Sequence, residues 1–347
     1  MPNNKFGIHI LFPGELETAA KLVNSSGGDW GYVTIPLQSD DRNLEKWQKF
    51  MDDAKQLHLI PIIRLATYPV SNYWLKPTLD DAVDFANFLN SLSWPVKNRY
   101  IILFNEPNEA KEWGYSVKPD EYAEFSNHAI DIFKTRNSEF YLLNAGLDAS
   151  LPNSAQSMDE YLYMKLMNNS VPGIFGKFDG FNSHSYPNPN FSSHPFNIDR
   201  YGIHSFEKEL NFIQNTFGVF GKKVFITETG WNNEVLDNDT ISMYFQTAYR
   251  DVWNKEYIVA VTPFLLSAGG GPFAKFSWTS PSYEPLPVFN KIQKIAKIKG
   301  QPSLSENLNP ASIKIEEQSN WSAQKTGMWN STSRKWIKNI LNFLTGQ

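Results

Sequence analysis

The fold is decided by residues 99–136, "RYIILFNEPNEAKEWGYSVKPDEYAEFSNHAIDIFKTR". An apolar run covers residues 101–104 and ends abruptly at Asn105. A polar segment follows, and then a segment with helical periodicity begins at Pro119. A proline followed by the acids Asp120 and Glu121 suits the first turn of a helix, where it matches the helix dipole. The stretch therefore predicts one β-strand followed by one α-helix.

The same order of strand and helix recurs along the chain. Seven further apolar runs, rich in Ile, Val, Phe and Tyr, each precede a segment of helical period. The eight strand–helix pairs begin, in chain order, at residues 5, 31, 59, 100, 140, 178, 222 and 258. Strands that alternate with helices predict a parallel sheet buried on both faces. Eight pairs in about 300 residues match an α/β fold of the (β/α)8 TIM-barrel type.

A doubly wound sheet is the alternative architecture. It usually carries a glycine-rich phosphate turn directly after its first strand. The corresponding residues 7–16, "GIHILFPGEL", contain no G-x-G-x-x-G. The sequence therefore favours the barrel.

The composition changes near residue 300, so we expect two parts. Residues 1–300 would form the barrel. Residues 301–347 form a polar extension rich in Ser and Asn, and its end, 334–346, returns to an amphipathic helical pattern. We expect that helix to dock on the barrel; a membrane-surface anchor or a partner contact is the alternative.

Composition excludes several classes of function. The chain has no Cys, which removes disulfides, thiolate catalysis and thiolate metal sites. Its net charge of −4 gives no electrostatic argument for binding nucleic acid or an anionic membrane. No apolar run reaches the ~18 residues that a membrane span needs. We expect a monomer.

The first residues, "MPNNKFGIHI", have no basic region followed by an apolar one, which a signal peptide would show. A secreted or cell-surface location is nevertheless our expectation. An export signal would then lie outside the printed residues.

Polar side chains follow several of the predicted strands. In a barrel of this type, functional groups lie at the C-terminal ends of the strands. The fourth run leads to Asn105 and Glu106, and the seventh ends in Glu228. Two carboxylates that meet in one barrel mouth can supply the acid, base and nucleophile that cleave a glycosidic bond. The alternative is that each glutamate is structural and pairs with Arg64 or a nearby lysine, because a buried unpaired charge is costly.

Other strand ends add candidates for the same mouth. The third run leads to Arg64, the sixth to His184 and Tyr186, and the first to His9, for which a site role and a structural role remain open. No H-E-x-x-H motif or carboxylate cluster with metal spacing occurs, so we expect neither a catalytic metal nor a cofactor.

Aromatic residues make up 15% of the chain, and several fall in loops after the predicted strands. Tyr73 and Trp74 follow the third strand, and Trp231 follows Glu228. Flat rings bury the C–H faces of sugars. Rings spread over several loops predict an extended cleft and endo-acting cleavage of a polysaccharide, although about half of them would pack the loops together.

Three motifs in this order resemble a known group of enzymes. "NEPN" at 105–108, "HSYP" at 184–187 and "TETGW" at 227–231 resemble the retaining glycoside hydrolases of clan A, in particular families five and thirty-nine. The similarity extends as topology over most of residues 5–297. It implies a TIM barrel that hydrolyses β-linked glycans by double displacement.

The resemblance also implies roles for individual residues. Glu106 would be the general acid/base and Glu228 the nucleophile. Asn105 would bind the sugar 2-hydroxyl, Tyr186 would contact Glu228, and His184 would lie near the acid/base or the substrate.

Two further roles follow from the same resemblance. Arg64 would lie beneath the nucleophile, and Trp278, after the eighth strand, would be the platform for the sugar at the cleaved bond. We therefore expect a retaining O-glycosyl hydrolase whose partner is an oligo- or polysaccharide. A non-catalytic carbohydrate-binding barrel and an exo-acting β-glycosidase or transglycosylase are the alternatives.

Overall fold

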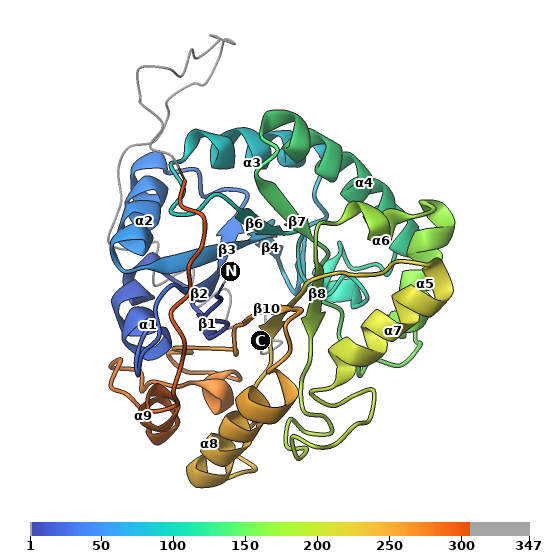
Figure 1. The fold of residues 1–347 in the computed structure, drawn as a ribbon. Coiled ribbons are helices and arrows are strands. Elements are labelled where there is room, and N and C mark those ends of the chain that lie inside the picture. Colours follow the sequence, from blue (N-terminus) through green and yellow to red (C-terminus); the bar gives the residue numbers. More distant parts are fainter. Residues whose placement is uncertain (1, 306–347) are drawn as a thin grey trace.

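The computed structural model describes residues 2–305 and shows a barrel of parallel strands surrounded by helices (Figure 1). This confirms the predicted (β/α)8 barrel. The eight barrel strands are β1 (Gly7–His9), β2 (Gly31–Gln38), β3 (Leu59–Ala66), β6 (Arg99–Ile102), β7 (Phe140–Leu143), β8 (Phe181–His184), β9 (Val224–Glu228) and β10 (Ile258–Val261).

The strands pair in parallel along two ladders, β1-β2-β3-β6-β7 and β8-β9-β10. Parallel bridges join the ladders at both seams. Phe6, just before β1, pairs with Val261, and Leu143 of β7 pairs with Gly180, just before β8. The sheet is therefore closed into a barrel.

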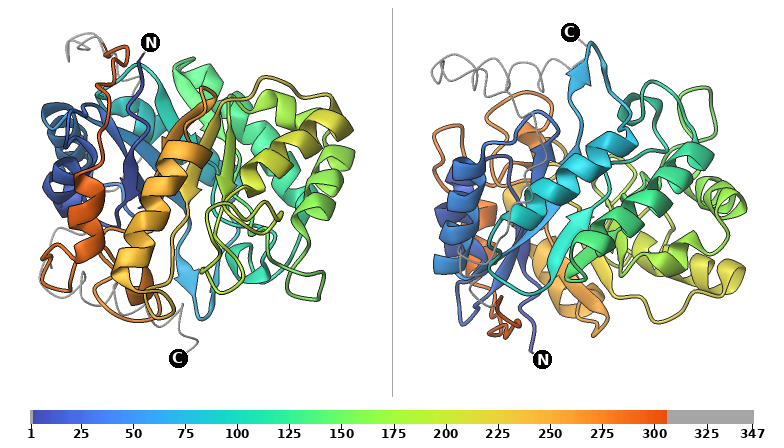
Figure 2. Two further views of the ribbon diagram at one scale, coloured as in Figure 1. Left: turned by 60° about the horizontal axis from the view of Figure 1, so that its bottom comes forward. Right: turned by 90° about the horizontal axis from the view of Figure 1, so that it is seen from above.

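Helices cover the outside of the barrel, as the two further views in Figure 2 show. They are α1 (Leu16–Val23), α2 (Leu44–Gln56), α3 (Leu79–Ser91), α4 (Pro119–Arg136), α5 (Glu160–Ser170), α6 (Ile174–Lys177), α7 (Ser205–Phe217), α8 (Asn238–Thr247) and α9 (Pro287–Gln293). Short helical turns are η1 (Pro13–Glu15), η2 (Ala110–Glu112), η3 (Ala248–Val252) and η4 (Ala274–Phe276). A hairpin of β4 (Pro69–Val70) and β5 (Tyr73–Trp74) projects beyond one end of the barrel.

Local signals in the sequence explain where the helices begin. The Thr78 hydroxyl accepts a hydrogen bond from the backbone N–H of Asp81, and the Asp81 carboxylate accepts one from the backbone N–H of Thr78. This capping box satisfies two backbone donors at the start of α3. Pro119 begins α4, as its sequence predicts.

The described residues form three buried apolar clusters, the smallest of which contains Phe264 and Phe276; the two larger ones make up the core of the barrel. The larger one lies between the strands and the helices. The smaller one, which includes Tyr32, Ile60, Ile62 and Phe225, fills the barrel interior. Because side chains alternate along a strand, Arg64 faces the same interior as Ile60 and Ile62, one step closer to the C-terminal end of β3. The core therefore aims a guanidinium group at the barrel mouth.

The chain after α9 returns along the start of the barrel strands. The backbone N–H of Gln301 donates to the carbonyl oxygen of Pro2, and Leu304 forms an antiparallel bridge with Val96. The remainder of the predicted extension, including the expected helix at 334–346, lies outside the described residues. Within residues 2–305, no helix combines the length and the apolar character that crossing a membrane requires.

Candidate active site

A cavity of about 270 Å³ opens at the C-terminal ends of the strands. Its polar lining includes Arg64, Asn105, Glu106, Glu109, Lys111, Glu112, Asp148, Tyr186 and Glu228. Its aromatic lining includes Trp74, Phe104, Phe191, Phe264, Phe273 and Phe276. The cavity therefore brings five carboxyl groups together with a wall of flat rings.

Glu228 reaches this cavity because of an irregularity in the barrel. Ser183 pairs with Ile226, but the next residue, His184, pairs with Glu228. Phe225 faces the interior, so strict alternation would turn Glu228 outward. The register shift changes its direction, as β-bulges beside active sites do. It also places Glu228 and His184 side by side at the mouth.

The carboxyl group of Glu228 is held by hydrogen bonds at both oxygens. Arg64 Nη1 donates to Oε1, and the Tyr186 hydroxyl donates to Oε2 at 3.0 Å. Burial alone would raise the pKa of Glu228. The positive charges of His184 and Arg64 and the Tyr186 hydrogen bond outweigh burial and lower that pKa to about 2. Glu228 is therefore a carboxylate at neutral pH.

Glu106 lies just after β6 on an unusual stretch of backbone. Phe104 has φ of 71° and Glu106 has φ of 29°. Positive φ is uncommon outside glycine and tends to occur at functional sites. The backbone N–H of Glu106 donates to the carbonyl oxygen of Gly146 at 3.1 Å, and the N–H of Glu109 donates to that of Glu106 at 2.9 Å. These bonds hold the turn that points the Glu106 side chain into the cavity.

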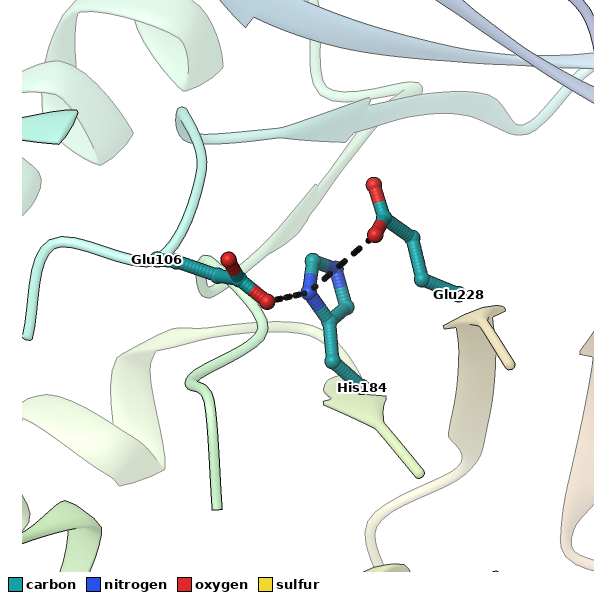
Figure 3. Close-up of side chains that lie close together, drawn as sticks. All are labelled: Glu106, His184 and Glu228. Carbon is teal, nitrogen blue, oxygen red and sulfur yellow. Dashed lines mark hydrogen bonds and ion pairs between the residues drawn. The ribbon is translucent and has the colours of Figure 1, made fainter. Parts of the chain in front are cut away.

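Glu106 has the opposite electrostatic environment to Glu228. His184 Nδ1 lies 2.8 Å from Oε1 of Glu106 and 3.8 Å from Oε2 of Glu228, so its ring stands between the two carboxyl groups (Figure 3). Burial raises the pKa of Glu106 to about 7, and the charges of Asp148 and Glu228 add to that rise, whereas the His184 hydrogen bond opposes it. Glu106 therefore keeps its proton up to a pH near 7, well above the pH at which an ordinary glutamic acid loses it.

One atom each of Glu106, His184 and Glu228 lies within 4.8 Å of the others. Such a set could hold a metal ion. The guanidinium group of Arg64 already donates to Glu228, which places a positive charge beside that position. Repulsion from this charge disfavours a second cation.

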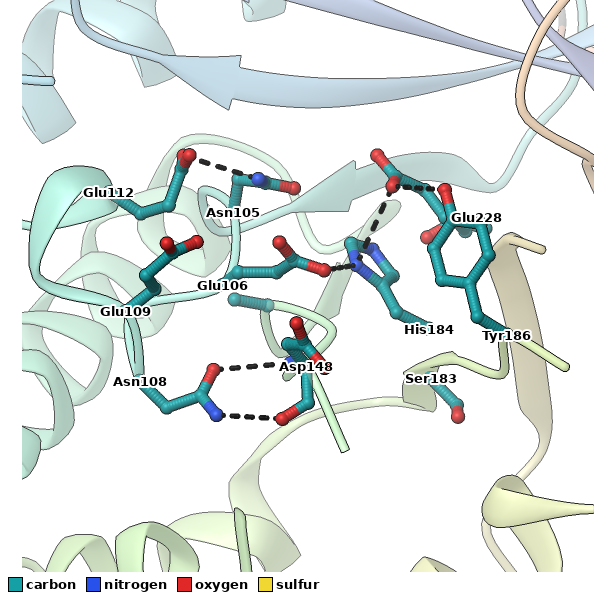
Figure 4. Close-up of polar contacts among 12 residues, drawn as sticks. Asn105, Glu106, Asn108, Glu109, Glu112, Asp148, Ser183, His184, Tyr186 and Glu228 are labelled. Atoms are coloured by element: carbon teal, nitrogen blue, oxygen red, sulfur yellow. Dashed lines mark hydrogen bonds and ion pairs between the residues drawn. The ribbon is translucent and has the colours of Figure 1, made fainter. Parts of the chain in front are cut away.

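Asn105 is fixed at both ends of its amide group. Its Oδ1 accepts from Arg64 Nη1 at 2.7 Å, and its Nδ2 donates to Glu112 Oε2 at 3.2 Å (Figure 4). Glu112 is not among the site residues that the sequence predicts. The sequence feature that points to Glu112 is the spacing of three residues between the glutamates at 106, 109 and 112. This spacing places acidic side chains along one short turn.

His9 lies beneath the cavity rather than in its lining. It is fully buried, and its Nδ1 is 3.9 Å from Oε1 of Glu228. Burial and the charge of Arg64 lower the pKa of His9 to about 3, so its ring is neutral. His9 supports the floor of the site.

The three tryptophans predicted to bind the sugar differ in where the structure places them. Trp74 lines the cavity. Trp231 and Trp278 are each 2% exposed, and their rings pack against Phe245 with centroids 4.7 and 4.9 Å away. The indole N–H of Trp231 donates to the backbone carbonyl of Ser193 at 2.8 Å. The expectation that Trp231 and Trp278 contact the sugar is therefore wrong, because both rings belong to the core outside the barrel strands.

Phe264, rather than Trp278, lines the cavity after the eighth barrel strand. Residues 258–266, "IVAVTPFLL", read as one apolar run, but β10 ends at Val261. Phe264 consequently lies past the strand end and lines the cavity, together with Phe276. Phe264 differs from the core residues of the same apolar run in that it lies beyond the end of β10.

No protein-family model and no curated protein sequence matches the chain. The fold does resemble solved structures of glycoside hydrolases. One is a family 39 glycoside hydrolase from Bacteroides cellulosilyticus WH2, with a TM-score of 0.60 and 15% identity over 85% of this chain. This chain spans 64% of that protein's length.

Two further structures are similar over most of both chains. A GH128 (subgroup II) endo-β-1,3-glucanase from Sorangium cellulosum gives a TM-score of 0.57 and 13% identity, covering 83% of this chain and 97% of the other. A GH5_18 protein from Bifidobacterium longum subsp. infantis gives 0.56 and 10%, covering 87% and 81%. At these identities the likeness concerns the fold alone. The chain has the (β/α)8 barrel that these glycoside hydrolases share.

Proposed function

We propose that this protein is a retaining glycoside hydrolase that cleaves β-glycosidic bonds with Glu228 as nucleophile and Glu106 as general acid/base. One observation carries the proposal: an oxygen of Glu106 and an oxygen of Glu228 lie within 4.8 Å of each other in one cavity, and the pKa values of the two groups are shifted in opposite directions. Retaining enzymes place their carboxyl groups about 5–5.5 Å apart, whereas inverting enzymes need roughly 6.5–9.5 Å to admit a water. The short separation supports the retaining reaction.

In the first step, an oxygen of Glu228 attacks C1 of the sugar. Arg64 and Tyr186 keep this group ionised and oriented. Glu106 gives its proton to the glycosidic oxygen as the C1–O bond breaks, so the leaving sugar departs as an alcohol. The product of this step is an ester between the sugar and Glu228.

In the second step, water releases the sugar. The charge of Glu228 is absent from the ester, and that charge was one of the causes that raised the pKa of Glu106. The pKa of Glu106 therefore falls, and its carboxylate takes a proton from the attacking water. The hydrogen bond from His184 favours this ionised form. The Glu228 carboxylate is regenerated when the ester bond breaks.

The rest of the cavity supports a polysaccharide substrate and endo-acting cleavage. Trp74 lines the cavity, and Tyr73 beside it packs against Tyr115, with ring centroids 5.8 Å apart. Tyr115 is 52% exposed, so aromatic rings of the loops after β3 and β6 also reach the surface. Exposed rings of this kind can stack on further sugars of a long glycan. Similar folds include endo-β-1,3-glucanases, which makes β-1,3-glucan the first substrate to test.

The primary experiment is a panel of β-linked polysaccharides with a reducing-sugar readout. Activity on at least one glycan is expected, with oligosaccharides as early products of endo cleavage; release of single sugars from the start would instead indicate exo action. Calorimetric binding of a glycan without any release of reducing ends would support a non-catalytic binding barrel.

Substitution of the nucleophile tests the mechanism. Glu228→Gln should abolish turnover, because an amide cannot form the ester. Glu228→Gly with added azide should regain activity and yield a glycosyl azide of inverted configuration. A Glu228→Gln protein with normal activity would overturn the proposal.

Substitution of the acid tests the second role. Glu106→Ala should slow natural glycans far more than aryl glycosides with good leaving groups, since the latter need little protonation. Equal losses on both substrates would contradict the acid role.

Activity should also survive EDTA, since every step is carried by side chains of the chain itself.

A further inference from the structure

We propose that Glu112 is a positioning residue: its carboxyl group holds the amide of Asn105 so that the second N–H of that amide faces the 2-position of the bound sugar. This inference rests on the proposed glycosidase function. Glu112 acts on the sugar through Asn105, to which it is hydrogen-bonded. The substrate group that depends on Glu112 is the 2-hydroxyl.

The orientation of the Asn105 amide follows from its two partners. Arg64 carries only donors, so the atom of Asn105 that faces it must be the carbonyl oxygen. The amide nitrogen therefore faces Glu112, which offers an acceptor oxygen at 3.2 Å. Without Glu112, only the bond to Arg64 would hold the side chain. With both bonds, the plane of the amide is fixed from two sides.

One donor of Asn105 remains for a ligand. An amide nitrogen has two hydrogens, and within residues 2–305 the nitrogen of Asn105 donates to Glu112 alone. Asn105 itself lines the cavity beside Glu106. The free N–H needs an acceptor, and a sugar hydroxyl oxygen next to C1 provides one. Hydrogen bonds to the 2-hydroxyl strengthen in the transition state of glycoside hydrolysis, so a fixed donor at this place increases the rate.

Glu112 is suited to holding another side chain rather than acting as a charge. It ends the short helix η2, and burial together with the nearby Glu106 raises the pKa of Glu112 to about 8. The neighbouring ion pair consists of Lys111 and Glu109, whose atoms are 3.0 Å apart. A neutral carboxyl group still accepts through its carbonyl oxygen. Glutamine offers the same oxygen at the same place, and alanine offers none.

A double-mutant cycle between protein and substrate tests this role. The substrates are aryl β-glycosides of glucose, galactose, xylose and mannose, each with its 2-deoxy counterpart. Glu112→Ala should lower kcat/KM on the best parent substrate by roughly ten- to a hundredfold, since a small misplacement of a positioning group can cost that much. On the 2-deoxy substrate the same variant should lose less than about threefold, because the contact it serves is already absent. Glu112→Gln should keep most of the activity on both.

The outcomes separate this role from a merely structural one. Equal losses of Glu112→Ala on both substrates, or no loss on either, would overturn the inference. Glu124→Ala, which removes an exposed carboxylate of α4 outside the cavity, is the matched control and should change neither rate. Thermal melting checks that both variants fold. Wild-type protein that cleaves none of the glycosides or polysaccharides would overturn the glycosidase function itself, and this role with it.

Discussion

Gly146 packs directly against the ring of His184, so closely that a β-carbon at Gly146 would lie 2.1 Å from Cδ2 and 2.5 Å from Nε2 of that ring. The same glycine accepts a hydrogen bond from the backbone N–H of Glu106. A residue without a side chain therefore lets the loop after β7 support both Glu106 and His184. Glycine is required here by close approach rather than by backbone conformation.

Gly146→Ala is expected to lower kcat/KM about a hundredfold, because the histidine ring must move and the Glu106 proton is then misplaced. The assay is hydrolysis of the best substrate from the polysaccharide panel. Gly176→Ala is the control, since a β-carbon at Gly176 in α6 would meet nothing within 4 Å. That variant should keep full activity. Gly146→Ala activity equal to that of the control would show that the ring is not held by this contact.

Tyr186→Phe is expected to shift only the acidic limb of the pH–rate profile. The Tyr186 hydroxyl donates to Glu228 and is one of the causes that lower its pKa. Without it, the pKa of Glu228 rises, so activity is lost at a higher pH as the solution is acidified. A charge-assisted hydrogen bond contributes about 1.5–3 kcal/mol, so kcat/KM should fall roughly ten- to a hundredfold. Rates measured from pH 3 to 9 test this, and an unmoved acidic limb would contradict it.

His184→Phe should move both limbs upward. The hydrogen bond from His184 opposes the raised pKa of Glu106, and its charge helps to lower that of Glu228. Loss of the imidazole therefore raises both pKa values. The basic limb reports deprotonation of the acid near pH 7 in the wild type and should appear at higher pH. Because the groups are coupled, the limbs describe the set together; a shift of either limb to lower pH would contradict the arrangement.

The barrel and the two glutamates could be predicted from sequence because both depend on local signals. Apolar runs that alternate with helical patterns predicted a strand at each barrel strand, and parallel strands bring their C-terminal ends to one mouth. Asn105 and Glu106 follow from the end of one apolar run. Arg64 follows from alternation along β3, since it shares a face with Ile62.

The rest of the site depends on details that periodicity does not encode. A register shift aims Glu228 at the mouth, and positive φ at Phe104 and Glu106 shapes the turn after β6. Whether an aromatic residue can contact a sugar depends on where its ring packs. The ring of Trp278 is buried in the core outside the barrel strands, whereas that of Phe264 faces the cavity. Sequence patterns cannot distinguish these cases, because Phe264 lies inside an apolar run that reads as one strand, and Trp278 follows that run.

Phe264 and Trp278 should respond differently to substitution. Phe264→Leu keeps apolar volume but removes the flat face, so KM should rise several-fold while stability changes little. Trp278→Phe leaves a cavity in the core and should lower the free energy of unfolding by roughly 1–3 kcal/mol, with KM unchanged. Denaturant titration and steady-state kinetics on both variants test this. A raised KM for Trp278→Phe at unchanged stability would restore Trp278 as a sugar contact.

A pair of buried acids outside the cavity predicts how stability depends on pH. Glu160 of α5 is fully buried, and Glu209 of α7, buried beside it, accepts a hydrogen bond from Ser183 at 3.0 Å. Burial raises the pKa of Glu209 to about 7, and burial and the charge of Glu209 raise that of Glu160. Arg200 Nη2, 3.8 Å from Oε1 of Glu160, opposes the shift only in part.

Both acids hold protons in the folded state that the unfolded chain releases near its ordinary pKa of about 4.3. Stability from this pair is therefore complete below that pH and is lost as the pH rises toward 7. Glu160→Gln removes one titrating group and should make the fall in melting temperature between pH 5 and 7.5 shallower. Some fall should remain, because Glu106 shifts in the same direction. Glu124→Gln, at an exposed position, should keep the wild-type slope, and an equal slope for Glu160→Gln would show that Glu160 titrates normally.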